Sequence, residues 1–212
     1  MKNKSIQAIR YLKTVFENDW KMPSKSMKCI ELFARTGDWH TKELFKGCED
    51  ITLLEIDDKY KSELSSNFPF AKIHIEDSIV WSSRILPNNS NYQSYNLVSI
   101  DNPLGVFGKS YCENFNIIEN VHKLLSDESI LLINIVPTPY GDTDRDWQAI
   151  RGKFFGIHPF EASKLNFETI LKRYKTILNE TGLDIEDYEY ICREYANDID
   201  YFYYLCLKLK RK

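Results

Sequence analysis

Four acidic residues recur along the chain at nearly equal intervals. Glu31, Glu55, Asp77 and Asp101 are separated by 24, 22 and 24 residues, and each stands at the end of a short apolar run or just beyond it. One strand and one helix between successive acids would place all four at the same edge of a parallel sheet, where open α/β proteins bind ligands. A carboxylate there accepts hydrogen bonds from ligand hydroxyl or amino groups. The spacing therefore predicts a polar-ligand site.

Glu55 is the acid most strongly indicated as a ligand residue. It follows Leu53 and Leu54 within an apolar run, where a buried carboxylate needs a partner. Asp38 and Asp57 instead open predicted helices, where the helix dipole favours an anion without any ligand. Asp77 fits either description.

Short apolar runs alternate with helix-forming stretches from residue 28 onward. The expected strands are Lys28–Phe33, Ile51–Ile56, Ala71–Ile75, Tyr95–Ile100 and Ser129–Val136. The expected helices are Asp38–Lys46, Asp58–Ser65, Ile79–Ile85 and Ser110–Leu125. Parallel neighbours need a crossover connection, so this alternation predicts βαβ units.

The alternation breaks after Val136. Pro137–Ser163 is rich in Pro, Gly and aromatic residues and is expected to be an acceptor-side insertion. An amphipathic helix over Lys164–Thr181 follows, and then two strands, Ile185–Arg193 and Asp200–Leu209, that are expected to pair as an antiparallel hairpin. The predicted fold is α/β, with three α/β/α layers around a doubly wound, mostly parallel, seven-stranded sheet that ends in this hairpin. Residues 28–212 form this domain, and residues 1–27 are expected to be a helical segment capping its cleft.

Composition limits the class of protein. The chain has 212 residues, of which 43% are hydrophobic, which suits one globular domain and excludes a disordered one. No apolar run approaches the roughly 18 residues of a membrane span, and residues 1–13 lack a secretory signal. The five cysteines form no CxxC pair and the four histidines never fall at i,i+4. We expect a cytoplasmic protein with free thiols, no metal site and no membrane partner.

The charge is unevenly distributed. Residues 1–28 hold seven Lys or Arg against two acids and residues 208–212 hold four basic residues, so a net charge of −3 leaves −12 on the part between them. A nucleic-acid binder normally carries a basic stripe on its working face. Only the two ends could supply one here, and solvated flanks explain them as well, so a small-molecule partner is favoured over nucleic acid. Nothing in the sequence predicts an oligomeric state.

These features resemble the class I S-adenosylmethionine-dependent methyltransferases over residues 28–209. In that family an acidic, glycine-rich first loop wraps the methionine part of the cofactor. The acid that ends the second strand binds the ribose hydroxyls, and an acid after the third strand meets the adenine. The resemblance implies S-adenosylmethionine as cofactor, with S-adenosylhomocysteine as product. The cofactor-binding residues that it implies are Glu31, Phe33, Ala34, Arg35, Thr36, Gly37, Glu55, Ile56, Asp77, Ser78 and Asp101.

The first loop departs from the family pattern. Leu32-Phe33-Ala34-Arg35-Thr36-Gly37 is similar to the L-F-A-G-T-G variant of several nucleic-acid methyltransferases, but Arg35 stands where a glycine is common. Arg35 is expected either to adopt the loop conformation at a steric cost or to pair with the cofactor carboxylate.

The acceptor is less constrained by the sequence. Asp101-Asn102-Pro103-Leu104 lies where amino-methyltransferases of DNA and RNA carry (Asp/Asn/Ser)-Pro-Pro-aromatic, but the aromatic residue is missing. We expect a small-molecule acceptor; the alternatives are a DNA or RNA amino-methyltransferase and a non-catalytic binding protein. A dehydrogenase is disfavoured because no G-x-G-x-x-G follows a predicted strand. The expected catalytic residues are Asp101, Asn102 and His158, and the expected substrate-binding residues are Pro103, Tyr111, Tyr140 and Arg151.

Overall fold

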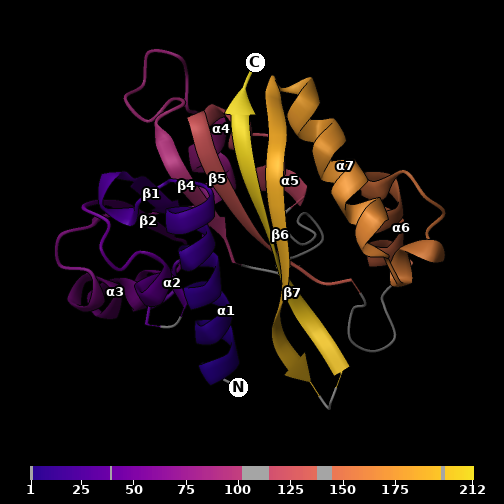
Figure 1. Cartoon of the computed structure of the whole chain (residues 1–212), viewed down its shortest axis with the longest axis horizontal. Coiled ribbons are helices and arrows are strands. Elements are labelled where there is room, and N and C mark those ends of the chain that lie inside the picture. Colours follow the sequence, from indigo (N-terminus) through magenta and orange to yellow (C-terminus); the bar gives the residue numbers. More distant parts are fainter. Residues whose placement is uncertain (1, 39, 102–114, 138–144, 197–198) are drawn as a thin grey trace.

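A twisted sheet runs through the centre of the molecule (Figure 1). The computed structural model describes residues 2–38, 40–101, 115–137, 145–196 and 199–212, and within them the sheet has seven strands in the order β3-β2-β1-β4-β5-β7-β6. The first five strands are parallel, and β7 runs antiparallel to both of its neighbours. The strands are β1 (Lys28–Glu31), β2 (Asp50–Glu55), β3 (Lys72–Ile75), β4 (Tyr95–Ile100), β5 (Leu125–Ile135), β6 (Leu183–Ala196) and β7 (Ile199–Arg211). The predicted fold class, including the C-terminal hairpin, is confirmed.

Helices cover both faces of the sheet. The α-helices are α1 (Lys2–Thr14), α2 (His40–Leu44), α3 (Lys61–Asn67), α4 (Ser78–Ser83), α5 (Phe115–Ile118), α6 (Arg145–Phe155) and α7 (Phe167–Glu180). Shorter helical turns are η1 (Val15–Asp19), η2 (Ser24–Ser26), η3 (Asp58–Tyr60), η5 (Val121–Lys123) and η6 (Glu161–Ser163). In the part of the chain that is described, every helix is too short or too polar to cross a membrane.

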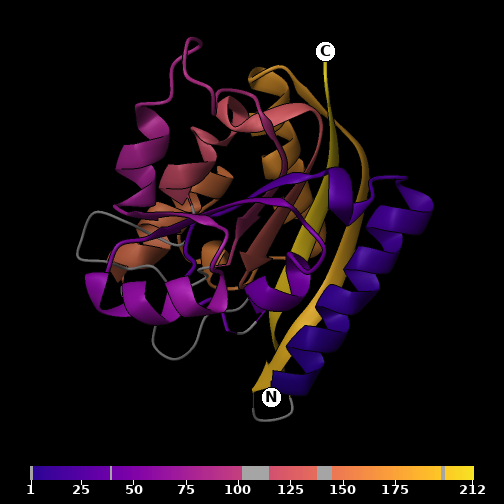
Figure 2. The same ribbon diagram turned by 90° about the vertical axis from the view of Figure 1, so that its left-hand side faces the viewer.

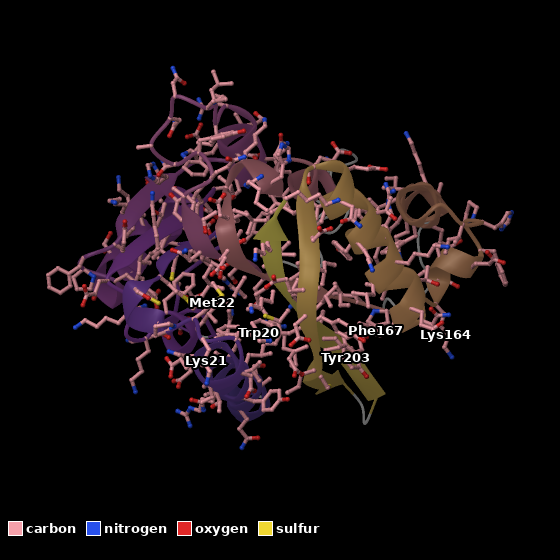
Figure 3. All side chains as sticks on the ribbon, turned by 45° about the horizontal axis from the view of Figure 1, so that its top comes forward. Trp20, Lys21, Met22, Lys164, Phe167 and Tyr203 are labelled. Atoms are coloured by element: carbon pink, nitrogen blue, oxygen red, sulfur yellow. The ribbon has the colours of Figure 1, made fainter. Side chains whose placement is uncertain are left out.

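Strand alternation divides the core into two clusters. In β5, Leu131 and Ile133 pack with α4, α5 and α7 on one face, whereas Ile130 and Leu132 pack with α1, α2 and α3 on the other. Successive side chains of a strand point to opposite faces, so a strand that is buried on both must be apolar throughout. Figure 3 shows the same division at the hairpin, with Trp20 on one side and Phe167 and Tyr203 on the other.

The N-terminal segment packs against the hairpin and α2. Figure 2 shows α1 running alongside β6. Ser5 Oγ donates to the carbonyl oxygen of Arg193 at 3.2 Å, and Trp20 Nε1 donates to Asp187 Oδ2 at 2.9 Å. Ile9, Leu12 and Phe16 follow helical spacing and are buried in the same cluster as the sheet. The segment therefore contributes its apolar face to the core.

Two secondary-structure predictions are wrong in part. The expected helix Ser110–Leu125 is, in its described part, α5 followed by the turn η5, because Leu125 already pairs with Tyr95 as the start of β5. The segment 137–163, for which no helix was expected, contains α6. A Cβ at Gly152 would lie 2.9 Å from the carbonyl oxygen of Ile157, so this glycine permits a close backbone contact.

Candidate active site

The loop after β1 is shaped by one arginine and one glycine with positive φ. Arg35 has φ +50° and Gly37 has φ +66°. A Cβ at Gly37 would lie 2.5 Å from Cε2 of Phe68, so the glycine allows the loop to pack closely against that ring. The guanidinium of Arg35 lies over the ring of Tyr60, with Cζ 5.4 Å from the centroid. Arg35 thus adopts the left-handed conformation that a glycine usually takes.

Glu55 connects this loop to the end of β2. Its side chain lies at the carboxyl edge of the sheet, and the residue is only 7% exposed. Oε2 accepts from the backbone N–H of Arg35 at 2.7 Å and Oε1 accepts from that of Asp57 at 2.8 Å. A carboxylate offers about four lone-pair sites, so each oxygen can still accept one more donor. The next residue, Ile56, is 55% exposed and presents an apolar surface beside this carboxylate.

Asp77 and Ser78 hold the start of α4. Asp77 is its N-cap, because Oδ1 accepts from the backbone N–H of Ile79 at 2.8 Å and of Val80 at 3.2 Å. Ser78 Oγ donates to the carbonyl oxygen of Leu32. Ser78 therefore binds α4 to the loop after β1, where Phe33 is half-buried against the core.

A set of buried polar side chains lies where β1, β4, β5 and the hairpin meet at the same edge; we name it the charge cluster. Sequence spacing had indicated only two of its members, the acids at the ends of β1 and β4. The others come from the start of α2, from β5 and from both strands of the hairpin. Its members are Glu31, His40, Asp101, Asn134, Arg193 and Tyr204.

Asp101 is the centre of the charge cluster. Oδ2 lies 2.6 Å from His40 Nδ1 and 3.1 Å from Arg193 Nη2, and Oδ1 accepts from Asn134 Nδ2. The Asp101 side chain is 1% exposed. Arg193 Nε also donates to the hydroxyl of Tyr204 at 3.0 Å. The carboxylate of Asp101 is therefore surrounded by donors from three other elements.

Glu31 forms the second anionic contact of His40. His40 Nε2 lies 3.3 Å from Glu31 Oε2, while Oε1 accepts weakly from the backbone N–H groups of Phe33 and Asp101, both at 3.4 Å. The imidazole ring is thus held between two carboxylates at the first residue of α2.

His40 and Asp101 shift each other's pKa values. Burial alone would lower the pKa of His40, but the charges and hydrogen bonds of Asp101 and Glu31 raise it to about 9. Burial would raise the pKa of Asp101, but the charges of His40 and Arg193 and hydrogen bonds from His40 and Asn134 hold it well below its usual value. At neutral pH His40 and Arg193 are therefore cations and Asp101 is an anion.

The residues expected on the acceptor side are less completely described. Asn102, Pro103, Tyr111 and Tyr140 lie outside the described residues. His158 is exposed on the turn after α6, and its Nδ1 accepts from the backbone N–H of Phe160 at 3.3 Å.

Arg151 is buried beneath that turn. Its Nε donates to the carbonyl oxygen of Ala162 at 2.9 Å, and its Nη2 donates to those of Val136 and Pro137 at 3.1 and 3.4 Å. These bonds tie α6 to η6 and to the end of β5. The sequence had indicated Arg151 as a substrate contact, and in the structure its guanidinium binds backbone carbonyls.

The basic C-terminal residues have acidic neighbours. Lys208 and Lys210 lie 3.3 and 3.9 Å from the two carboxylate oxygens of Glu186. Arg211 Nε lies 3.4 Å from Asp127 Oδ1, and Lys212 Nζ lies 3.4 Å from Asp184 Oδ1. Four basic side chains that the sequence left available for nucleic acid are thus close to carboxylates. Among the residues whose positions are described, no group of three or more His, Cys, Asp or Glu is arranged to hold a metal ion.

Comparison with solved structures identifies the fold. TYW2 of M. jannaschii, solved in complex with AdoMet, superposes with a TM-score of 0.58 at 11% identity, over 99% of this chain and 77% of that one. A proposed RNA methyltransferase of Pyrococcus horikoshii gives 0.58 at 13% identity, over 97% and 84%. The CurJ carbon methyltransferase gives 0.58 at 17% identity, over 94% and 53%. This chain has the class I methyltransferase fold.

The resemblance is one of structure and not of sequence. No protein-family model matches the chain, and neither does any curated protein sequence. The chain also spans only about three fifths of the protein in two further solved structures from Pyrococcus horikoshii, at 61% and 60% of its length.

Arg35 is the residue at which the first loop departs most from the methyltransferase pattern. Its positive φ predicts how two substitutions at this position affect stability. An Arg35→Gly variant is expected to be more stable than Arg35→Ala by about 1 kcal/mol, because both lose the contact with Tyr60 and only alanine keeps the steric cost of a positive φ. Urea unfolding of the two variants measures this difference.

The matched control for Arg35 is Ser65, which is exposed within α3. At this helical position the alanine variant should be the more stable of the two, with Ser65→Ala exceeding Ser65→Gly by about 1 kcal/mol. Equal stability of the two Arg35 variants would contradict the left-handed conformation of this residue.

Proposed function

We propose that this protein is an S-adenosylmethionine-dependent methyltransferase. The observation that carries the proposal is the carboxylate of Glu55, which lies at the end of β2 with one backbone donor on each oxygen. The class I fold supports it. When bound, the cofactor supplies a methyl group on a positively charged sulfur, so the protein contributes mainly binding and orientation.

The residues of this edge fit the cofactor chemically. Each oxygen of Glu55 retains a lone pair for one hydroxyl of a ribose, and the exposed side chain of Ile56 offers an apolar surface to an adenine ring. Asp77 and Ser78 would border the same ring. The loop Glu31–Gly37, with Phe33, Ala34, Arg35 and Thr36, would hold the methionine part.

Asp101 is proposed as a positioning residue. Its carboxylate is enclosed by His40, Arg193 and Asn134, so it fixes the point at which the chain leaves β4 and does not face solvent. We assign the acceptor side to the residues that follow it, Asn102, Pro103 and Tyr111, together with Tyr140. His158 is retained as a candidate proton acceptor because it is exposed.

A small-molecule acceptor is proposed in preference to nucleic acid. Residues 29–207 carry a net charge of −12, and the basic side chains after them lie near Glu186, Asp127 and Asp184. Nucleic-acid binding weakens steeply with salt in proportion to the phosphates neutralised. Retention of RNA with such a salt dependence would favour the alternative of an RNA amino-methyltransferase.

Titration calorimetry with S-adenosylmethionine and S-adenosylhomocysteine tests the cofactor. The wild-type protein is expected to bind both. Glu55→Gln is expected to weaken binding at least about tenfold, or about 1.4 kcal/mol. The reason is that an NH₂ group, which can only donate hydrogen bonds, replaces one of the two accepting oxygens. The control is Asp58→Asn, which makes the same change of charge at an exposed residue three positions on.

Each outcome of this titration has a definite meaning. Weakened binding by Glu55→Gln alone supports the proposed site, whereas equal weakening in both variants indicates a general electrostatic effect. Absence of binding to the wild-type protein would favour the non-catalytic alternative.

A further inference from the structure

A groove opens at the amino-terminal edge of the sheet, opposite the edge that carries Glu55. It has a volume of about 520 Å³ and lies between the end of α2 and the segment that joins α3 to β3. This volume is within the range of about 300–1,000 Å³ that small-molecule sites occupy. Its apolar lining includes the buried rings of Phe45 and Phe68 and the side chain of Ile51, the second residue of β2. The groove is therefore large enough for a small ligand that is apolar in part.

Phe70 presents an aromatic ring at this groove. It belongs to the lining and is 95% exposed, more than any other large hydrophobic residue in the described part of the chain. The backbone beside it is fixed, because Phe68 packs against Gly37 and its carbonyl oxygen accepts from the backbone N–H of Ala71 at 3.2 Å. An exposed aromatic face on a fixed backbone is a surface on which a planar ring can stack.

The acids of the groove are neutralised from outside it. Its lining contains two carboxylates, and each lies within 4.0 Å of a cation that is not part of the lining. Glu43 Oε1 lies 2.9 Å from Arg10 Nε, and Glu49 Oε1 lies 3.9 Å from Lys25 Nζ. These two acids therefore offset little of the positive charge of the groove itself.

Lys42 and Lys46 supply that positive charge. Both line the groove and are exposed, and neither forms an ion pair with another residue of the described ranges. Lys13 Nζ, which donates to the carbonyl oxygens of Lys46 at 2.6 Å and Glu43 at 3.2 Å, adds a third cation at the same turn. Lysine ammonium groups bind phosphate as point charges. The groove thus combines an exposed aromatic ring with charges that suit a phosphate.

We propose that this groove binds a nucleoside monophosphate, whose base stacks on Phe70 and whose phosphate lies between Lys42 and Lys46. A phosphate monoester carries about −1.5 to −2 charge at pH 7, which two ammonium groups complement. Every base has a π-face, so stacking on a single ring accepts a nucleotide without selecting among the bases.

A mononucleotide fits the charge of the protein better than a nucleic acid chain does. A polynucleotide would extend beyond the groove over a chain whose residues 29–207 carry a net charge of −12. A phosphate backbone binds where many phosphates are neutralised, and such a balance opposes it. The positive charge of the groove is local and suits one phosphate.

The groove is separate from the proposed cofactor site. Ile51 lines it near the start of β2, whereas Glu55 ends that strand and lies at the other edge of the sheet. The groove also uses no residue of the charge cluster. A failure of either proposal leaves the other intact.

Titration calorimetry of the whole protein with uridine monophosphate tests the groove. This probe lacks the adenine of the proposed cofactor. The wild-type protein is expected to bind it at least about tenfold more tightly than inorganic phosphate, because stacking of one base contributes about that factor. Uridine, which lacks the phosphate, is expected to bind more weakly than uridine monophosphate as well.

Substitution of the ring tests the stacking contact. Phe70→Ser is expected to weaken binding of uridine monophosphate at least about tenfold. The side chain is exposed, so the fold should be retained. The matched control is Phe160→Ser, at a ring that is 77% exposed on the turn after α6, and this variant should bind as wild type does.

Substitution of the lysines tests the phosphate contact. Lys42→Gln combined with Lys46→Gln is expected to weaken binding at least about fivefold, the effect of removing two exposed charge contacts. Lys172→Gln combined with Lys175→Gln makes the same change of charge at exposed residues of α7 and should have little effect.

Four results would overturn the proposal. The first is absence of uridine monophosphate binding to the wild-type protein, and the second is binding that neither Phe70→Ser nor the Lys42 and Lys46 double variant weakens. The third is a loss of binding in Glu55→Gln, which would place the nucleotide in the proposed cofactor site. The fourth is binding of oligouridylate at least about tenfold tighter than that of the mononucleotide, which would identify nucleic acid as the ligand.

Discussion

Replacing Asp101 by asparagine is expected to lower the free energy of unfolding by about 3–5 kcal/mol, the cost of removing one partner from a buried ion pair. The substitution keeps the size of the side chain. It removes the anion that faces His40 at 2.6 Å and Arg193 at 3.1 Å, and it can turn an amide donor toward them. His40 and Arg193 would then lose the carboxylate that they share. Urea denaturation followed by circular dichroism measures the loss.

The control for Asp101 is an aspartate of an exposed ion pair. Asp50 Oδ1 lies 2.9 Å from Lys72 Nζ, with both side chains largely in solvent. Asp50→Asn is expected to cost under about 1 kcal/mol, because such pairs contribute little. If Asp101→Asn were no more destabilising than Asp50→Asn, the charge cluster would not stabilise the fold.

A double replacement measures the interaction energy between Asp101 and His40 separately from their contacts with other residues. Removing both charges, in Asp101→Asn combined with His40→Gln, is expected to cost less than the sum of the two single variants, because neither partner is then left unpaired. Additive losses would mean that His40 and Asp101 act independently despite their contact.

The edge of the sheet that carries the candidate site was predictable, because periodicity is a local property of the sequence. Acids spaced by one strand and one helix must return to the same edge of a parallel sheet, and the structure has Glu31, Glu55 and Asp77 at or just beyond the ends of β1, β2 and β3. The antiparallel hairpin was predicted on separate grounds, from two strand-like runs that a short turn-like segment separates.

The charge cluster was not predictable from spacing. Arg193 lies 92 residues from Asp101 along the chain, and they meet because β7 pairs with β5 and β6 in a register that joins Asn134 to Tyr204 and Ile191 to Tyr204. No local pattern encodes such a register. The signals that were present are polar residues within apolar strands, such as Asn134, since a buried polar group requires a partner.

Arg151 shows how composition leaves the partner of a charged side chain undetermined. An arginine among aromatic residues suggested a ligand contact, but the Pro and Gly content of this segment gave no indication of α6. Once that helix forms, Arg151 is directed inward to three carbonyl oxygens. Whether a charged side chain binds substrate or backbone depends on helix packing, which the segment's composition did not reveal.

The charge cluster also predicts how stability depends on pH. The pKa of His40 is about 9 in the folded protein, above its ordinary value of 6.5. Its contribution to stability is therefore complete below pH 6.5 and is lost as the pH rises through 9. A shift of this size corresponds to about 3 kcal/mol at 1.36 kcal/mol per unit. The free energy of unfolding is therefore expected to fall by about this amount as the pH rises from about 6 to about 10, the range in which His40 titrates. Urea denaturation at a series of pH values measures the decrease.

Two histidine variants isolate this effect from other groups that titrate at alkaline pH. His40→Gln should be less stable than wild type near pH 6 and should lose less stability on going to pH 10, because the histidine held by Asp101 and Glu31 is gone. His158→Gln, at an exposed histidine, should keep the wild-type profile. A parallel fall in His40→Gln and wild type would show that His40 is not a cation in the folded protein. Asp101 would then lack one of the two positive charges that hold it ionised in the interior.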